Sequence, residues 1–161
     1  MSIARAMTAL VVCVVLFAGS AAAADEVPFR GVWSGQTDSA TPVGPGVVLV
    51  ISSGSGQATH LGRFTMVSPH FTFIDTLVVA GQQIFTAANG DTLTALFTGQ
   101  FVPNADGNLE ATLSAVITTG TGRFLGATGG YEFHIVARPA AFGFDSTATF
   151  SGAVTSVGSL K

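Results

Sequence analysis

Four polar side chains fall on strand faces that are otherwise apolar, and these side chains could do chemistry inside a protein. They are His60, Asp75, Tyr131 and Ser146. A buried imidazole or carboxylate is unfavourable unless it is paired or hydrogen-bonded. If His60 and Asp75 meet inside the fold, they form an acid–base pair or a polar anchor for a ligand. Alternatively, they satisfy backbone groups or lie at strand ends near water, and a break at residues 68–69 would expose Asp75.

Three further residues are candidates for ligand contacts. Arg63 and Arg123 each precede a phenylalanine in a Gly-Arg-Phe context. An arginine at the mouth of a barrel would hold a carboxylate, whereas the alternative is a solvated turn residue. Trp33 alternates with glycines, so it either lines a cavity, fills the core or plugs one end of the fold.

The patterns required by several other chemistries are missing from the sequence. The three histidines are scattered, and the one cysteine lies near the N-terminus, so we predict no metal site. No Gly-x-Ser-x-Gly motif is present, nor is a third residue that would complete a catalytic triad. No glycine-rich loop precedes a helix that could hold phosphate. We therefore expect no cofactor, and we leave open whether the protein is an enzyme.

The elements that must position these side chains are β-strands. After residue 25 no window sustains a helical apolar period, whereas alternation with period two recurs. It predicts about nine strands with one buried and one solvated face, as antiparallel sheets allow. The clearest cover residues 92–101, 110–119 and 144–154, and the less regular ones cover residues 29–36, 46–53, 58–66, 71–79, 82–87 and 131–138.

Turn residues separate these strands. Asn89-Gly90 predicts a tight two-residue hairpin turn in which both residues have positive φ, and residues 41–46, 53–56 and 105–108 are expected to be longer loops. Long strands joined by short turns favour an up-and-down barrel or a sandwich. Because few charges are available to guard sheet edges, we predict an all-β fold, a single antiparallel β-barrel of about eight or nine strands.

Residues 1–24 have the order of a cleavable secretory signal peptide. Arg5 precedes an apolar run over residues 7–18, and small residues end at Ala24, just before Asp25. The apolar run is shorter than the roughly 20 residues that a membrane-spanning helix needs. We therefore expect a secreted protein, periplasmic or extracellular, with one β-barrel domain over residues 25–161 and no membrane association after cleavage.

Charged residues make up only 9% of the chain, against an average near 25%. The part after the predicted cleavage site has nine acidic and five basic side chains, a net charge of −4. Nucleic-acid binding needs a basic surface that neutralises phosphates, so we expect no nucleic-acid partner. The polar surface must consist mainly of Ser, Thr, Gln, Asn and Gly.

Residues 117–131, Ile-Thr-Thr-Gly-Thr-Gly-Arg-Phe-Leu-Gly-Ala-Thr-Gly-Gly-Tyr, resemble a segment of dirigent proteins and allene oxide cyclase-like barrels. The resemblance implies an eight-stranded antiparallel barrel. Gly120 and Gly122 would permit a tight turn, with Phe124 and Ala127 in the core. Residues 56–65 also look like a stretch found in many secreted bacterial proteins of unassigned function. The acidic and basic residues by which dirigent proteins and allene oxide cyclases act on their substrates have no counterpart here. The resemblance therefore does not imply their activity.

Three functions are compatible with these observations. The first is a secreted barrel that binds a small hydrophobic or aromatic ligand, a hypothesis motivated by thirteen phenylalanines and by the room for one small ligand inside eight-stranded barrels. The second is a cyclase- or dirigent-like enzyme acting on a hydrophobic intermediate with His60, Asp75 or Tyr131. The third is an extracellular structural module or homo-oligomer, which apolar residues on polar faces favour. These residues are Leu96, Val116 and Val136.

Overall fold

The computed structural model describes residues 25–155, and these residues are predominantly β-strand. The predicted signal peptide lies outside the described residues. The strands are β1 (Glu26–Gly44), β2 (Val47–Ala58), β3 (Gly62–Phe73), β4 (Val78–Ala87), β5 (Thr92–Gln100), β6 (Val102–Pro103), β7 (Leu109–Gly120), β8 (Gly129–Pro139) and β9 (Phe144–Thr155). One short 3-10 helix, η1 (Gly122–Phe124), joins β7 to β8.

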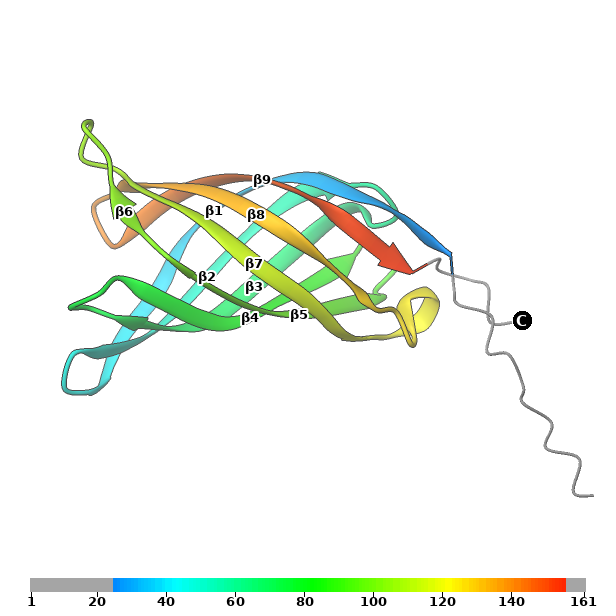
Figure 1. Cartoon of the computed structure of the whole chain (residues 1–161), viewed down its shortest axis with the longest axis horizontal. Helices are drawn as coiled ribbons and strands as arrows, with labels where there is room; N and C mark the ends of the chain where they lie inside the picture. Colours follow the sequence, from blue (N-terminus) through cyan, green and yellow to red (C-terminus); the bar gives the residue numbers. More distant parts are fainter. Residues whose placement is uncertain (1–24, 156–161) are drawn as a thin grey trace, which may run out of the picture.

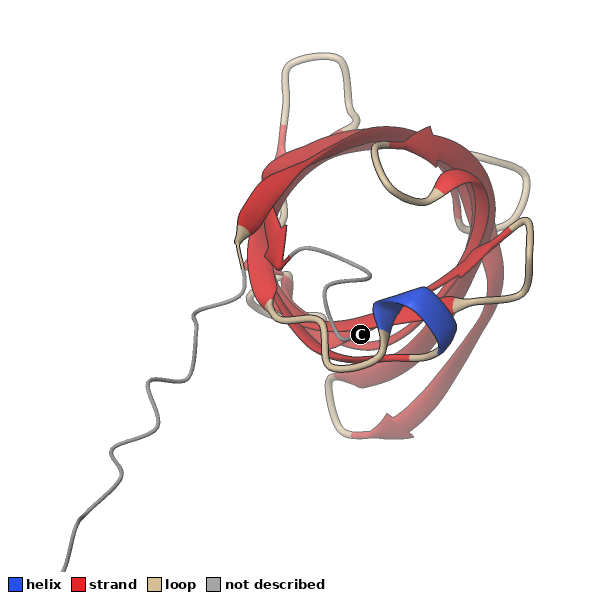
Figure 2. Cartoon of the chain, turned by 90° about the vertical axis from the view of Figure 1, so that its right-hand side faces the viewer, coloured by secondary structure: helices blue, strands red, loops and turns tan. Residues whose placement is uncertain are grey.

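Eight of the strands form a closed antiparallel barrel (Figure 1). The hydrogen-bonded order is β5-β4-β3-β2-β1-β9-β8-β7, and pairing of β5 with β7 closes the ring. Figure 2 looks at the η1 end and shows the strands closing around the barrel axis. The one remaining strand, β6, pairs only with the first residues of β7. The predicted barrel is confirmed.

The chain turns alternately at two ends of the barrel. The η1 end carries the turn at residues 59–61, the turn at residues 88–91 and η1 itself. The far end, on the left of Figure 1, carries the connections at residues 45–46, 74–77, 101–108 and 140–143. The interior of the barrel differs between these two ends.

The prediction placed two strands across turns, and this was wrong. Residues 58–66 include the turn at residues 59–61, where His60 has φ 65°, and residues 71–79 include the turn at residues 74–77, where Leu77 has φ 55°. Both are left-handed conformations at non-glycine residues, which sequence patterns rarely reveal. Between these turns β3 keeps one register with β2 and β4, even though β3 contains Pro69.

Other predicted turns also differ. Residues 53–56 form part of β2 rather than a loop, and neighbouring strands occupy the space beside the two glycines. A Cβ at Gly54 would meet the backbone of β1, and one at Gly56 would meet the Phe64 ring. β1 continues to Gly44, so only two residues join it to β2. The turn at Asn89-Gly90 spans four residues, and Gly90 alone has positive φ, 88°.

Aromatic rings pack the η1 half of the barrel. Neighbouring ring centroids lie between 5.1 Å for Phe29–Phe150 and 6.2 Å for Phe29–Phe85. At this end Phe124 and Ala127 are buried, as predicted, together with Leu61. This half is filled by its own side chains, so the prediction of a phenylalanine-lined hollow does not hold here. The aromatic cluster consists of Phe29, Phe64, Phe85, Tyr131, Phe133 and Phe150.

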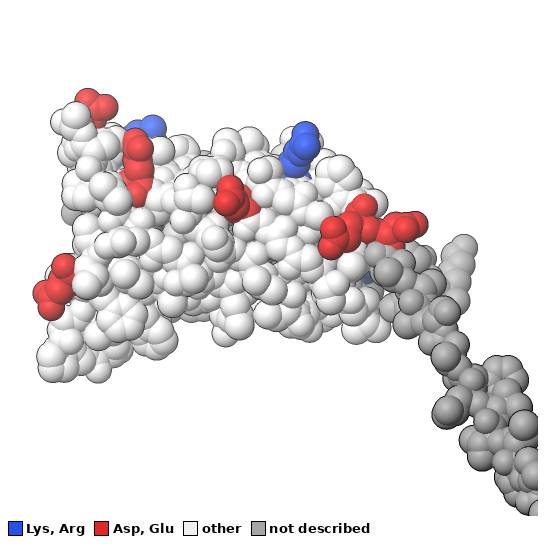
Figure 3. Space-filling view, in the orientation of Figure 1, with Lys and Arg blue, Asp and Glu red and all other residues white. Residues whose placement is uncertain are grey.

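The outer surface carries few charges, and on the face seen in Figure 3 they stand singly except for one group of acidic atoms toward the right-hand end. Among residues 25–155, no helix has the length and apolar character needed to cross a membrane. The same residues contain no group of three His, Cys, Asp or Glu side chains that could hold a metal ion.

Candidate functional site

The interior of the barrel on the far side of the aromatic cluster contains a cavity of about 40 Å³, which we call the chamber. Aromatic, aliphatic and neutral polar side chains line it, and none of its lining residues is Asp, Glu, Lys or Arg. The lining residues are Trp33, Ser52, Met66, Ser68, His70, Val79, Gln83, Phe97, Phe101, Leu113, Phe133, Ile135 and Ser146. The chamber therefore combines hydrogen-bonding groups with apolar walls and carries no fixed charge.

Trp33 lines the chamber and carries an unpaired donor. It lies on β1 with its side chain inside the barrel, and it is only 4% exposed. Its ring lies against Phe133, with centroids 6.0 Å apart. Within residues 25–155, Trp33 Nε1 is the one fully buried side-chain nitrogen or oxygen without a hydrogen-bond partner. An indole N–H can only donate, and leaving such a donor unsatisfied costs about 1–3 kcal/mol.

His70 supplies a neutral acceptor. Its Nδ1 lies 3.1 Å from the backbone carbonyl oxygen of Ser68. A carbonyl only accepts hydrogen bonds, so Nδ1 carries the proton and Nε2 carries a lone pair. Burial lowers the pKa of His70, and the hydrogen bond to the Ser68 carbonyl opposes this only in part. The imidazole is therefore neutral at pH 7.

Gln83 and Tyr131 form a buried pair behind the chamber. The Tyr131 hydroxyl donates to Gln83 Oε1 at 2.6 Å, and both residues are almost completely buried. Burial strongly raises the pKa of Tyr131 above its ordinary value, so the phenol stays protonated and remains a donor. Oε1 already accepts a hydrogen bond from Tyr131. The amide nitrogen of Gln83 is therefore the group of this side chain that can donate a hydrogen bond to a ligand in the chamber.

The predicted pair of His60 and Asp75 does not form. His60 lies in the turn before β3, and Asp75 lies in the turn after it, so the twelve residues of β3 separate them along the barrel. Both residues are exposed. The prediction failed because β3 passes through Pro69 without a bulge and ends at Phe73. Both residues instead lie at strand ends near water, which was the alternative expectation.

The two arginines also lie outside the chamber. Arg63 is exposed at the start of β3. Arg123, in η1, places Nε 3.7 Å from Asp91 Oδ2 and donates from Nη2 to the carbonyl oxygen of Leu61 at 3.3 Å. Hydrogen bonds from Asn89 and from the Arg123 backbone N–H, with the Arg123 charge, lower the pKa of Asp91. Arg123 thus holds the turns of the η1 end together.

Trp33, Tyr131 and Ser146 do face the interior, as their alternation indicated, and Trp33 and Ser146 line the chamber. Ser68 and His70 were not predicted, because residues 71 and 73, rather than 70 and 72, were assigned to the inward face. Continuing the alternation of Phe64 and Met66 past Pro69 would have found both. Gln83 and Ser52 were also missed.

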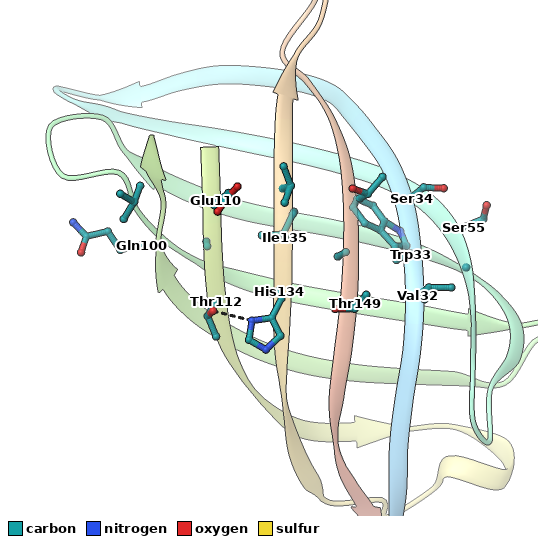
Figure 4. Close-up of a pocket in the computed structure, with 16 residues that line it drawn as sticks. Val32, Trp33, Ser34, Ser55, Gln100, Glu110, Thr112, His134, Ile135 and Thr149 are labelled. Atoms are coloured by element: carbon teal, nitrogen blue, oxygen red, sulfur yellow. Dashed lines mark hydrogen bonds between the residues drawn. The ribbon is translucent and has the colours of Figure 1, made fainter. Parts of the chain in front are cut away.

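A second hollow lies on the outside of the barrel (Figure 4). It has a volume of about 770 Å³ and is lined mainly by β1, β9, β8 and β7, with further residues from β2, β5 and β6. Thr112 Oγ1 lies 2.9 Å from His134 Nδ1, and Glu132 Oε2 lies 3.7 Å from His134 Nε2. This places a hydroxyl, an imidazole and a carboxylate in series, although the sequence motifs predicted no triad. The side chains of His134 and Glu132 are 51% and 63% exposed, so water competes for these contacts, and we assign them no catalytic role.

Comparison with known proteins gives a likeness of fold only. No family model matches the chain, and no curated protein matches it. Two similar solved structures are those of the pterocarpan synthase dirigent proteins PsPTS1 and GePTS1. PsPTS1 is 11% identical, with a TM-score of 0.50 over 83% of this chain and 96% of that one. GePTS1 is 12% identical, with a TM-score of 0.49 over 85% and 88% of the two chains. The chain has a dirigent-like β-barrel fold.

Proposed function

We propose that this protein is secreted and that its chamber binds a small hydrophobic or aromatic ligand. The observation that carries the proposal is the unpaired Trp33 Nε1, buried in the wall of a cavity that holds other neutral polar groups. Buried donors are nearly always satisfied by protein, water or ligand. A ligand atom that accepts this hydrogen bond would remove the cost of the orphan donor.

The size of the chamber limits how the ligand sits. Drug-sized ligands occupy pockets of roughly 300–1,000 Å³, whereas about 40 Å³ holds one functional group or a water molecule. The polar end of the ligand would enter the chamber, and its apolar body would lie toward the far end. Phe101 and Ile135 line the chamber there and are only half-buried, as is Val50, which pairs with His70. Covering these side chains would supply apolar burial.

Secretion is supported by the charged, apolar and small-residue order of residues 1–24. The net charge and the shortage of charged residues also suit an extracytoplasmic protein. Expression of the full chain with its leader in a secreting bacterial host, followed by intact mass measurement, tests this part. A mature chain that begins at or near Asp25 is expected, and retention of residues 1–24 would contradict secretion by cleavage.

Trp33 also makes the binding proposal measurable, because it is the one tryptophan of the chain. The probe is N-phenyl-1-naphthylamine, a neutral apolar fluorophore that accepts energy from tryptophan. We expect saturable energy transfer from Trp33. Ser52→Leu would fill the chamber and weaken binding, whereas Ser55→Leu, which adds the same side chain at an exposed position of β2, would not. Equal binding by the two variants would contradict a site in the chamber.

A cyclase- or dirigent-like enzyme loses support as the alternative. That hypothesis used His60, Asp75 or Tyr131 around one intermediate, but His60 and Asp75 lie in exposed turns at opposite ends of β3. Tyr131 is buried in the aromatic cluster and donates to Gln83. No acid–base pair converges in the chamber from these three residues.

A homo-oligomer is favoured by a separate observation on the outer surface. Val67, Phe71, Phe73 and Ile74 are 42–50% exposed on β3 and the turn that follows it. Strands β2–β5 contain one charged residue, Arg63, so the surface would suit an equally uncharged face of a second copy. Leu96 and Val116, predicted on polar faces, are also exposed and lie opposite each other on β5 and β7. Light scattering tests this, and a monomer at every concentration would contradict it.

A further inference from the structure

We infer that the chamber selects a neutral hydroxyl group on its ligand, with Trp33 donating to the hydroxyl oxygen and His70 accepting its proton. This inference rests on the proposed function and adds the chemical class that the chamber recognises. It makes Trp33 and His70 specificity-determining residues. A hydrocarbon, aldehyde or ketone end would leave one or both of these groups unpaired.

The donor side is fixed by packing. The Trp33 ring is buried among strands whose glycines leave room for it: a Cβ at Gly35, on the same strand, would collide with the indole. The Phe133 ring lies beside it. The indole therefore keeps its position while its N–H lacks a partner. A ligand oxygen that reached Nε1 from the chamber would give the indole N–H the acceptor that it lacks.

The acceptor side is fixed by the backbone of β3. Pro69 has no N–H, and the pairing of β3 with β4 is interrupted at Ser68 and Pro69 although the register continues. The Ser68 carbonyl accepts from His70 Nδ1, which sets the tautomer and leaves the lone pair on Nε2. A hydroxyl can donate to Nε2 while it accepts from Trp33, because one oxygen serves both roles.

Other chemical classes match the chamber less well. A carboxylate would be desolvated without a cation, since no Lys or Arg lines the chamber and His70 is neutral. An aldehyde or ketone can accept from Trp33 but cannot donate to Nε2. A hydrocarbon satisfies neither group. The chamber also holds neutral polar groups that can bind any of these ligand classes and do not change which class fits best. They are the Gln83 amide nitrogen and the hydroxyls of Ser52, Ser68 and Ser146.

Four probes of matched size separate these classes: benzyl alcohol, benzaldehyde, toluene and benzoate. Their affinities for the purified mature protein are measured by isothermal titration calorimetry at pH 8. We expect benzyl alcohol to bind about three- to tenfold more tightly than benzaldehyde or toluene, the ratio that one or two net hydrogen bonds provide. Benzoate is expected to bind most weakly.

Variants assign the preference to its two residues. Trp33→Phe removes the donor and His70→Leu removes the acceptor, and each should bring benzyl alcohol to within about twofold of toluene. His134→Leu, at the exposed histidine on the outer surface, is the control and should keep the full preference. Toluene affinity reports whether each variant chamber is intact, because toluene uses neither hydrogen bond.

The outcomes separate the inference from the proposed function. Equal affinity of the wild-type protein for the three neutral probes would overturn the hydroxyl inference and leave ligand binding standing. Tightest binding of benzoate, or a preference for benzyl alcohol that survives both variants, would also overturn the inference. Absence of binding by all four probes would overturn the proposed function together with the inference.

Discussion

Replacing Tyr131 by phenylalanine tests the buried polar pair behind the chamber. The substitution removes one hydroxyl and leaves Gln83 Oε1, in a side chain 1% exposed, without the donor that now lies 2.6 Å away. Leaving a buried acceptor unsatisfied costs about 1–3 kcal/mol. For a domain of this size about 1 kcal/mol corresponds to roughly 4 °C in Tm. We therefore expect Tyr131→Phe to lower Tm by about 4–12 °C.

A double-mutant cycle with Gln83→Met separates this effect from general damage to the aromatic cluster. Methionine has nearly the shape of glutamine and no amide, so the double variant removes both partners at once. Replacing both partners by apolar groups of similar shape is close to neutral. We expect the double variant to be more stable than Tyr131→Phe, with a coupling energy of about 1–2 kcal/mol from urea unfolding. A Tyr131→Phe variant as stable as wild type would refute the reasoning, as would additive losses in the double variant.

Three further predictions concern other parts of the barrel. The pKa of His70 is lower in the folded state than its ordinary value of 6.5, so the unfolded chain takes up the proton first and stability is lost as pH falls from above 6.5 toward the folded pKa. Urea unfolding at several pH values should therefore show that the free energy of unfolding falls less steeply with falling pH in His70→Leu than in wild type. Parallel pH dependences of the two proteins would contradict this. Asp91→Ala should lower Tm and speed hydrogen exchange at η1, because Asp91 accepts from Asn89 and the Arg123 backbone. Asp106→Ala, in an exposed loop, is its control, and equal effects would argue against the proposed anchoring of η1. If β3 forms a dimer face, Phe71→Ser should weaken dimerisation about tenfold or more in light scattering, while Phe142→Ser, in the turn before β9, should not.

The sequence predicts the fold well where one strand face is uniformly buried. In β5, β7 and β9 most inward residues are Leu, Ala, Phe, Ile or Val, with Ser146 an exception, and the outward ones are mainly Thr, Ser or Glu, so period-two alternation gives both strand and face. In β2 the inward positions include Gly54 and Gly56, which looked like a loop. Only the structure shows that the Phe64 ring occupies the space beside Gly56.

The chamber was predicted less well than the barrel, for a similar reason. Trp33, Tyr131 and Ser146 were placed inside because each alternates with apolar residues or glycines along its strand. His70 was missed because Pro69 suggested a break, whereas β3 continues in register with both neighbours. The partner of Tyr131 comes from β4, 48 residues away, and such a contact follows from barrel closure and register rather than from local sequence.

In the proposed function, a ligand group in the chamber accepts a hydrogen bond from Trp33. Because the chain has one tryptophan, a proton–nitrogen NMR spectrum of the labelled protein contains one indole resonance, from Nε1–H of Trp33. We expect benzyl alcohol to move this resonance saturably to higher proton frequency while backbone resonances of the η1 end stay in place. An indole resonance that does not move at saturating benzyl alcohol would contradict it.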